Sequence, residues 1–311
     1  MSDDHNIAIF QIADKPDGKE LKIHAKGKGC RENIMSLAFS PGYDCLVATC
    51  VKSVLFFTWA NGAVSKSNKG TGWGKTAADT ILCQAHIGST LYTGTLGSEI
   101  ITWQGTAISG RFKAHQKRIN CMFATESGKL ITGSHDYTVK VWEQGGSRGL
   151  QLLRTLELQS PDVGSVSPAA VSVCAQGDSI LVGTRGAEII EFDLKGNADF
   201  LVRGHFNDEL WGLALHPKAP IITTWGRDGM LATWDLHQMS QIDNEKFPIG
   251  GDALALSNDG TLIALGFLNG TLKILKEDFS PVVERKDRKG KALQVIKFTP
   301  DDSICVTGAH D

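Results

Sequence analysis

The stretch INCMFATESGKLITGSHDYTVKVW, residues 119–142, decides the fold of this 311-residue chain. It contains three short apolar runs, and the second run ends at Gly133, just before a tight turn. The runs are rich in β-branched and aromatic residues and are bounded by Gly, Ser and Asp, a pattern typical of β-strands joined by turns. The third run ends on an aromatic residue, Trp142. The stretch therefore predicts three short strands.

The same order of runs and turns recurs along the whole chain. Five further complete copies lie at residues 33–59, 80–103, 169–192, 210–234 and 253–275. A seventh copy, residues 293–311, stops at the tight turn, but the N-terminal stretch DHNIAIF (4–10) has the form of its missing third run. The repeat length is about 43 residues, so the chain holds about seven repeats. The glycines that end the second run are Gly94, Gly133, Gly183, Gly266 and Gly308.

Between the aromatic end of one copy and the next apolar run lies a variable stretch with room for a fourth, outer strand. A four-stranded repeat of roughly 40–45 residues is the signature of a β-propeller blade. We therefore predict an all-β, seven-bladed β-propeller, a single domain over residues 1–311. An N-terminal strand completes the C-terminal blade and closes the ring, which removes an exposed sheet edge. The predicted blades span roughly residues 13–59, 60–103, 104–142, 150–192, 196–234, 240–275, and 280–311 plus 4–12.

Composition excludes several other classes of protein. Hydrophobic residues make up 41% and charged residues 21% of the chain, which indicates a globular rather than a disordered protein. The net charge of -2 argues against a protein that works mainly by neutralising phosphates. No apolar run approaches the length of a membrane span, and the acidic start MSDDHN is not a secretory signal. The seven scattered cysteines, without CxxC, indicate reduced thiols rather than a disulfide scaffold or zinc site.

Two of the copies resemble the WD-repeat family. One carries Ala-His at 114–115 and the other Gly-His at 204–205, each followed by Thr, Asp and Trp at similar spacings. The resemblance implies a WD40-type propeller with a His–Ser/Thr–Asp–Trp hydrogen-bond relay inside these blades. A buried Asp needs donors, and His and Trp each supply an N–H. The relay residues are then His115, Thr132, Asp136 and Trp142 in one copy, and His205, Thr224, Asp228 and Trp234 in the other. Other copies depart from the pattern at Gly97, Gly186 and Asn269, where Asp is expected, and at Cys50, where Gly is expected.

A closer resemblance covers nearly the whole chain. The segments GHFNDELWGLALHP (204–217), VKSVLFFTWANG (51–62), ILVGTRGAEIIEF (180–192) and ICVTGAHD (304–311) resemble the echinoderm microtubule-associated-protein-like family. Members of that family bind tubulin or microtubules through a tandem pair of propellers. The resemblance implies that this chain is one propeller of a longer protein, cytoplasmic and associated with the cytoskeleton.

No catalytic site is predicted. The chain has no HExxH motif and no Cys/His zinc spacing, and GTGWGK (70–75) lacks both the spacing of a phosphate-binding loop and a following helix. Asp208 and Glu209 are adjacent, so on an extended chain their side chains point apart. We therefore expect a non-enzymatic protein with no cofactor, no metal and no small-molecule substrate.

The candidate binding face is defined by the residue that precedes the tight-turn position of each blade. These residues are Lys52, Leu96, His135, Arg185, Arg227, Leu268 and His310. None is acidic, Lys117 and Arg118 lie on a nearby loop, and Asp208 and Glu209 offset part of the charge. Our hypothesis is that this loop face is locally positive and attracts an acidic protein partner. The simpler interpretation is that exposed turns favour charged residues of either sign.

The leading prediction is a protein-interaction scaffold that binds tubulin or microtubules, since tubulin's surface is acidic. The alternative is a generic WD-repeat adaptor in signalling or ubiquitin-ligase assembly. A propeller hydrolase or lyase would need paired carboxylates or metal ligands along the axis, and the strands expected there offer few. Nucleic-acid binding would need interleaved basic and aromatic residues, which are missing. We expect neither nucleic acid nor membrane as a partner.

Overall fold

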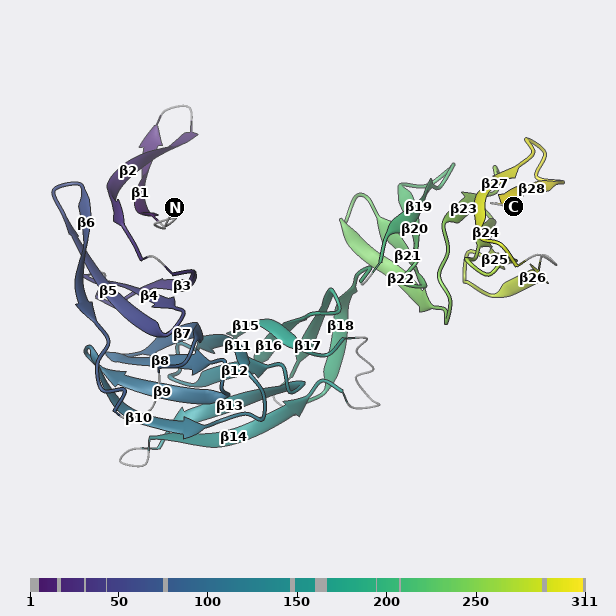
Figure 1. Cartoon of the computed structure of the whole chain (residues 1–311). Helices are drawn as coiled ribbons and strands as arrows, with labels where there is room; N and C mark the ends of the chain where they lie inside the picture. Colours follow the sequence, from purple (N-terminus) through teal and green to yellow (C-terminus); the bar gives the residue numbers. More distant parts are fainter. Residues whose placement is uncertain are drawn as a thin grey trace. The chain divides into compact units, whose positions relative to one another are not determined.

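The computed structural model describes residues 6–15, 18–30, 32–42, 44–74, 78–145, 149–159, 167–193, 195–206, 208–286 and 290–309. These residues form strands β1 to β28, grouped in seven sheets (Figure 1). The number of sheets equals the number of repeats predicted. No helix in the described ranges is long and apolar enough to cross a membrane.

The chain divides into two compact units, and the division runs through the fourth sheet. The first unit comprises Met1–Arg185 and Ile190–Asp199, and the second comprises Gly186–Ile189 and Phe200–Asp311. We describe each unit by itself.

The first three sheets lie in the first unit. The first sheet has the order β1-β2-β6-β5-β4-β3, and the next two have four strands each. The strands of the first sheet are β1 (Asn6–Lys15), β2 (Gly18–Lys28), β3 (Ile34–Phe39), β4 (Leu46–Cys50), β5 (Ser53–Ala60) and β6 (Ala63–Lys69). Those of the second are β7 (Ile81–Ile87), β8 (Thr90–Thr95), β9 (Glu99–Gln104) and β10 (Ala107–Lys113). Those of the third are β11 (Ile119–Ala124), β12 (Leu130–Ser134), β13 (Thr138–Gln144) and β14 (Leu150–Glu157).

The remaining sheets continue the series with strands in sequence order. The fourth sheet contains β15 (Ala170–Gln176), β16 (Ser179–Thr184), β17 (Glu188–Phe192) and β18 (Ala198–Arg203). The fifth contains β19 (Leu210–Leu215), β20 (Ile221–Gly226), β21 (Met230–Asp235) and β22 (Ser240–Lys246). The sixth contains β23 (Ala253–Leu256), β24 (Leu262–Gly266), β25 (Thr271–Lys276) and β26 (Pro281–Lys286). In the described residues the seventh holds β27 (Leu293–Phe298) and β28 (Cys305–Ala309).

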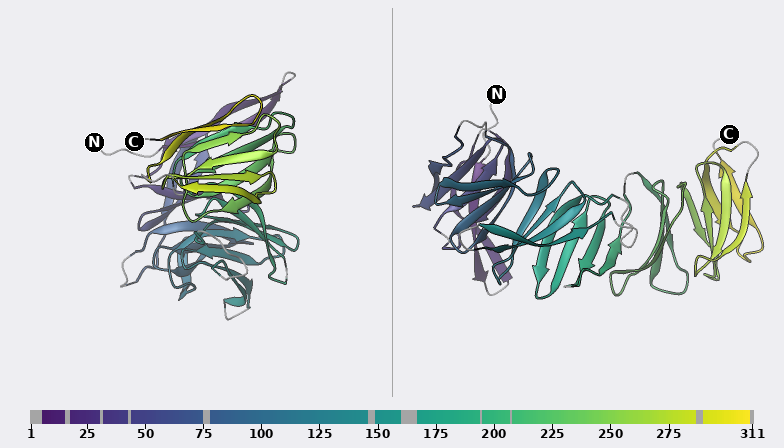
Figure 2. Two further views of the ribbon diagram at one scale, coloured as in Figure 1. Left: turned by 90° about the vertical axis from the view of Figure 1, so that its right-hand side faces the viewer. Right: turned by 90° about the horizontal axis from the view of Figure 1, so that it is seen from below.

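The core lies between neighbouring sheets, which pack face to face within each unit (Figure 2). Every residue of β4 and of β12 is buried, because each strand is covered on both faces. Between the first and second sheets, Phe56 packs with Ile81 and Trp103 in one buried cluster. Such packing removes apolar surface from water at about 25 cal/mol per Å², which is why no single sheet is stable alone.

The repeated glycine at the end of the second run is explained by this packing. A Cβ on Gly133 would lie 2.5 Å from Sγ of Cys121 and 2.8 Å from the Cβ of Ala170, the first residue of the next sheet. Gly94 has the same relation to Ile119, at 2.8 Å from its Cγ2. A side chain here would push neighbouring sheets apart, so the glycine is required for close approach.

Each of the outer strands β6 and β10 pairs in the blade before the one that the sequence predicts. The predicted blades place residues 63–69 and 107–113 with the strands that follow them, but β6 pairs with β5 and β10 pairs with β9. A short turn joins each outer strand to the strand before it. The two strands therefore pair as an antiparallel hairpin, and the outer strand does not join the sheet that follows. The sequence repeat and the sheet are therefore offset by one strand.

The N-terminal strand is also paired locally. Residues 6–15 form β1, which pairs with β2 in a hairpin, and β2 joins the first sheet through a parallel pairing of Lys26 with Ala63. Ile7 and Ala25 of this hairpin are buried in the first sheet's cluster. Closure of the ring by residues 4–12 is not confirmed by this pairing and stays a prediction, and Asp4 lies outside the described residues.

Candidate interaction site: the relays and a basic patch

The third sheet contains a continuous chain of hydrogen bonds through four of the residues singled out in the sequence. Trp142 Nε1 donates to Thr132 Oγ1 at 2.9 Å, and Thr132 Oγ1 lies 2.8 Å from Nε2 of His115. On the other side of the imidazole, Nδ1 lies 3.1 Å from Oδ2 of Asp136. If Thr132 donates to Nε2, every donor in the chain points towards the carboxylate.

Asp136 is held as an anion by this arrangement. Burial by itself raises the pKa of Asp136, but hydrogen bonds from His115, the backbone N–H of Gln116 and Thr138 outweigh burial and hold its pKa well below the ordinary range. The N–H of Gln116 is 2.8 Å from Oδ2, and the hydroxyl of Thr138 is 2.8 Å from Oδ1. The carboxylate is thus fully occupied inside the blade.

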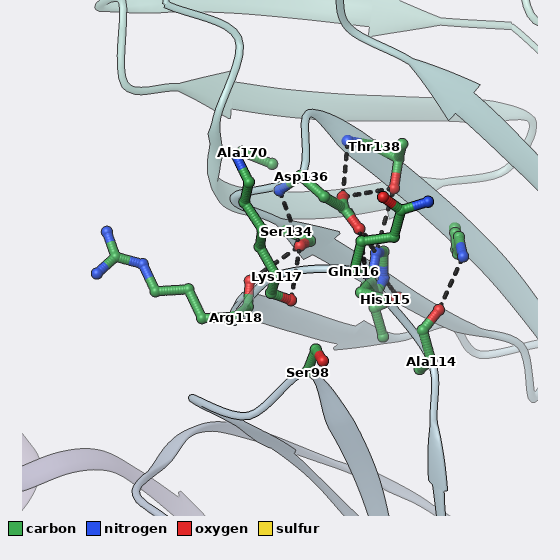
Figure 3. Close-up of polar contacts among 12 residues, drawn as sticks. Ser98, Ala114, His115, Gln116, Lys117, Arg118, Ser134, Asp136, Thr138 and Ala170 are labelled. Atoms are coloured by element: carbon green, nitrogen blue, oxygen red, sulfur yellow. Dashed lines mark hydrogen bonds and ion pairs between the residues drawn. The ribbon is translucent and has the colours of Figure 1, made fainter.

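The same network positions the loop that carries Lys117 and Arg118 (Figure 3). Asp136 takes the N–H of Gln116, and the hydroxyl of Ser134 lies 3.1 Å from the carbonyl of Lys117 and 2.9 Å from that of Arg118. Hydrogen bonds to Asp136 and from Ser134 therefore hold the backbone of this loop, while its three side chains at 116–118 are exposed.

The fifth sheet, in the second unit, repeats the relay. Trp234 Nε1 donates to Thr224 Oγ1 at 3.0 Å, His205 Nε2 lies 2.9 Å from the same oxygen, and Nδ1 lies 3.1 Å from Oδ1 of Asp228. Burial raises the pKa of Asp228, but the hydrogen bonds from His205 and from two backbone N–H groups lower it below the ordinary value.

The second sheet replaces part of the relay with a residue that the sequence reasoning missed. Trp103 Nε1 still donates to Thr93 Oγ1 at 3.0 Å. Where Gly97 stands in place of Asp, its N–H donates instead to Oδ2 of Asp79 at 2.6 Å. A Cβ on Gly97 would lie 2.6 Å from that oxygen, so the glycine makes room for the carboxylate. Asp79 lies 18 residues before the turn, and the repeat pattern gave no signal for it.

In the first sheet, no indole occupies the position that Trp103 and Trp142 take in the next two sheets. Val47 pairs with Phe56, whereas Leu91 pairs with Trp103 and Leu130 with Trp142. The two-residue turn between Cys50 and Ser53 shortens the hairpin, so the aromatic Trp59 that ends the repeat lies farther along β5, opposite Val64. Thr49, fully buried, is left with no hydrogen-bond partner for its hydroxyl among the described residues.

This difference predicts opposite effects of one substitution. Thr49→Val removes an unsatisfied buried hydroxyl and should raise the free energy of unfolding by about 1 kcal/mol. Thr132→Val leaves Nε1 of Trp142 and Nε2 of His115 without their partner and should lower the free energy of unfolding by about 2 kcal/mol. Urea denaturation of the two variants checks the pair. Equal losses of stability in both would contradict the assignment of Thr49 as unpartnered.

Four of the predicted face residues gather in the first unit. We call Lys117, Arg118, His135 and Arg185 the basic patch. The N–H of His135 donates to the carbonyl of Arg118 at 3.0 Å, and Lys117 Nζ lies 4.9 Å from the ring centroid of Tyr137. Burial, followed by the charges of Arg118, Lys117 and Arg185, lowers the pKa of His135. Protonation of His135 is therefore opposed by three cations.

A side-chain hydrogen bond from the third sheet to the fourth, and a backbone hydrogen bond beside the fourth sheet, bring Arg185 to the patch. Asn120 Nδ2 donates to the carbonyl of Ala170 at 2.7 Å, and the N–H of Arg185 donates to the carbonyl of Ala169 at 2.8 Å. In the described part of the chain, Lys117, Arg118 and Arg185 form no ion pair, and Nδ1 of His135 has no hydrogen-bond partner. The patch therefore presents uncompensated positive charge.

Arg227, unlike the cations of the basic patch, is paired with carboxylates. Its Nε lies 2.7 Å from Oδ1 of Asp252, its Nη2 3.1 Å from Oδ2, and its Nη1 2.7 Å from Oε2 of Glu209. Glu209 also accepts from Trp211 Nε1 at 2.8 Å. Two carboxylates offset this guanidinium, so Arg227 adds little positive charge to the face.

The other predicted face residues are described within their own units. Lys52 is exposed in the turn after β4, and Asp208 is exposed beside Glu209 in the second unit. His310 lies outside the described residues. Across the described ranges, no three His, Cys, Asp or Glu side chains are grouped as a metal site would require.

Comparison with known proteins supports the repeat. The family model "WD domain, G-beta repeat" matches residues 107–143, a span that begins at β10 and ends in β13. The solved structure of U3-55K aligns with a TM-score of 0.50 at 16% identity, covering 90% of this chain and 89% of that one, which shows a shared fold.

The full-length resemblance inferred from the residues is confirmed. The chain is 25% identical over 315 residues to echinoderm microtubule-associated protein-like 2 of Mus musculus, which covers 100% of this chain and 46% of that protein. It is 26% identical over 318 residues to echinoderm microtubule-associated protein-like 1 of Homo sapiens, covering 99% of this chain and 37% of that protein. The chain thus spans about half or less of these relatives. The chain has an all-β propeller fold with a match to the WD repeat at residues 107–143, and along its whole length it resembles the echinoderm microtubule-associated protein-like proteins.

Proposed function

We propose that this chain is a non-enzymatic protein-interaction scaffold of the cytoskeleton that binds an acidic protein partner, tubulin, through the basic patch. The observation that carries the proposal is the group of uncompensated cations around His135 in a chain whose net charge is -2. Positive charge is concentrated on this face although the composition as a whole is slightly acidic.

The proposal follows from electrostatics. After burial, the charges of Arg118, Lys117 and Arg185 are the main causes that lower the pKa of His135, so these cations lie close together and would gain from a nearby anion. The backbone beneath Lys117 and Arg118 is held by the relay, so little ordering of the loop is needed on binding. Complementary charge mainly accelerates association, and salt weakens its effect.

The names of the relatives support tubulin as the proposed partner. The proteins that resemble this chain along its length carry microtubule association in their names. An acidic protein surface of that kind fits a patch with three exposed cations. Cytoskeletal association is therefore the location that we propose.

Co-sedimentation with polymerised tubulin tests this function. We expect the chain to pellet with microtubules at about 50 mM salt and to be released progressively as salt rises to about 300 mM, since screening shortens the range of the patch's field. An unrelated propeller of similar net charge serves as the control and should stay in the supernatant.

A bound fraction no greater than that of the unrelated propeller would contradict the proposal. Capture of non-cytoskeletal proteins in a pull-down, together with no co-sedimentation, would favour the adaptor role in signalling or ubiquitin-ligase assembly instead.

A further inference from the structure

Two cysteine sulfurs lie in contact in the first sheet. Sγ of Cys30 is 3.3 Å from Sγ of Cys50. Cys50 is the last residue of β4 and is fully buried, whereas Cys30, two residues beyond β2, is partly exposed. The thiol of Cys30 also donates to the carbonyl of Glu32 at 2.8 Å. Cys30 is thus partly accessible to solvent, whereas Cys50 is buried.

Cys50 occupies the place where other blades require glycine. Gly94 and Gly133 lie against the first residue of the following sheet, at distances that leave no room for a Cβ. In the first sheet this position carries a thiol instead, and the thiol faces Cys30. The side chain therefore has a specific neighbour exactly where the repeat normally has no side chain at all.

We propose that Cys30 and Cys50 are an oxidation site that forms a disulfide with a mild oxidant of the peroxide class. Ordinary disulfides have an S–S distance of about 2.05 Å, so the sulfurs must approach by little more than 1 Å. The pair stands on geometry that no other cysteines share: among the described residues, no other two sulfurs are in hydrogen-bonding contact.

The chemistry balances with hydrogen peroxide as the electron acceptor. The thiolate of Cys30 attacks one peroxide oxygen, the O–O bond breaks, and water leaves after proton uptake, which gives a sulfenic acid on Cys30. The sulfur of Cys50 then attacks the Cys30 sulfur, loses its proton and expels a second water. In total, two thiols lose two electrons and two protons, and one peroxide becomes two waters.

The environments assign the order of the two steps. Burial, followed by the hydrogen bond and charge of Cys30, raises the pKa of Cys50 to about 12. Cys50 therefore stays a thiol at neutral pH and cannot react first, while Cys30 can meet the oxidant from solvent. Cys50 acts as the resolving thiol.

The new bond would tie the end of the N-terminal hairpin to the centre of the first sheet. Outside this contact the hairpin is held by the Lys26–Ala63 pairing, by the hydrogen bond from Lys26 N–H to the Gly62 carbonyl at 3.1 Å, and by Ile7 and Ala25 in the core. We expect slower hydrogen exchange in residues 18–28 after oxidation, because opening of the hairpin is restrained.

Peptide mapping of the full chain tests the site. The chain is treated with hydrogen peroxide, remaining thiols are blocked with N-ethylmaleimide, and trypsin then yields the peptides 29–31 and 32–52. We expect these two peptides to be joined, with the loss of two hydrogen atoms, and to separate on reduction. Fragmentation distinguishes Cys50 from Cys45, which lies on the same peptide.

Two variants provide the controls. Cys45→Ser should still give the joined peptides. Cys30→Ser, at the partly exposed position, should abolish them without disturbing the buried core. Exposed Cys174 reports that the oxidant has acted. The proposal is overturned if Cys30 and Cys50 are both fully labelled by N-ethylmaleimide under conditions in which Cys174 is oxidised, or if the joined peptides are lost in Cys45→Ser.

Discussion

Asp136→Ala should lower the free energy of unfolding by about 3 kcal/mol, the largest single effect on stability that we expect in this chain. The substitution removes the acceptor for His115, for the N–H groups of Gln116 and Thr138, and for the Thr138 hydroxyl. The N–H groups of Gln116 and Thr138 then lose their acceptor, and His115 Nδ1 and the Thr138 hydroxyl keep only their 3.1 Å contact with each other. Urea denaturation measures the loss.

The same variant should also loosen the backbone of the loop at residues 116–118. Because Asp136 holds the N–H of Gln116, its removal should also increase hydrogen exchange in residues 116–118. Asp193→Ala is a matched control: Asp193 accepts backbone N–H groups in an exposed turn of the same unit, and its loss should cost much less. A loss in Asp193→Ala equal to that in Asp136→Ala would contradict a special role for the relay.

The effect of Asp136→Ala should shrink in acid. The pKa of Asp136 is lowered in the folded state, so its stabilising contribution is complete above the unfolded pKa, near 3.8, and is lost as pH falls through and below that value. The pKa of His135 is also lowered, and the charge of Asp136 partly offsets that shift, so without Asp136 the gap between wild type and variant should widen slightly as pH falls through the ordinary histidine value of about 6.5. We expect the gap to narrow below about pH 4, where Asp136 itself is protonated in the unfolded state.

The fold could be predicted because every repeat carries the same local chemistry. Short β-branched runs, tight turns and a glycine where sheets meet are all properties of neighbouring residues, and they predict the number of sheets. The pairing of outer strands could not be predicted so well. A repeat alignment shows where strands recur but not which neighbour each one joins, and β6 and β10 join the strand before them.

The residues of the relay follow from the sequence for the same reason. His115, Thr132, Asp136 and Trp142 stand at spacings that recur at His205, Thr224, Asp228 and Trp234. Where a repeat departs from these spacings, the sequence does not predict which residues replace the relay. Nothing local indicates that Asp79 serves the turn at Gly97, or that the short turn after Cys50 leaves Thr49 without an indole.

The charge of the face depends on contacts between repeats. Arg227 and Arg185 occupy equivalent turn positions and are equally basic in the sequence. Only the structure shows that Asp252, 25 residues away in the chain, offsets Arg227, while Arg185 has no such partner among the described residues. From sequence position alone, Arg227 and Arg185 are expected to contribute equally to the positive charge of the face.

The patch should therefore dominate binding to an acidic partner. We expect the double variant Arg118→Glu/Arg185→Glu to weaken binding to tubulin about tenfold or more at low salt, because reversed charge removes steering and adds repulsion. Neither side chain has an ion pair to lose in the described part of the chain, so the fold should be unchanged. Adding Arg227→Glu is not needed, since that residue is already offset.

A matched control lies in turns at the opposite ends of the third and fourth sheets. Lys129 immediately precedes β12, whereas His135 follows it, and Lys195 lies in the turn between β17 and β18, whereas Arg185 lies in the turn between β16 and β17; both lysines belong to the first unit. Lys129→Glu/Lys195→Glu changes the net charge by the same amount as the patch variant. Any difference between the two variants then reports position rather than overall charge.

The affinity for polymerised tubulin of these two double variants, measured side by side at about 50 mM salt, is the most direct measurement. The basic patch predicts a loss of about tenfold or more for Arg118→Glu/Arg185→Glu and a change within about twofold for Lys129→Glu/Lys195→Glu. Equal losses in both variants, or no loss in either, would contradict binding through the patch.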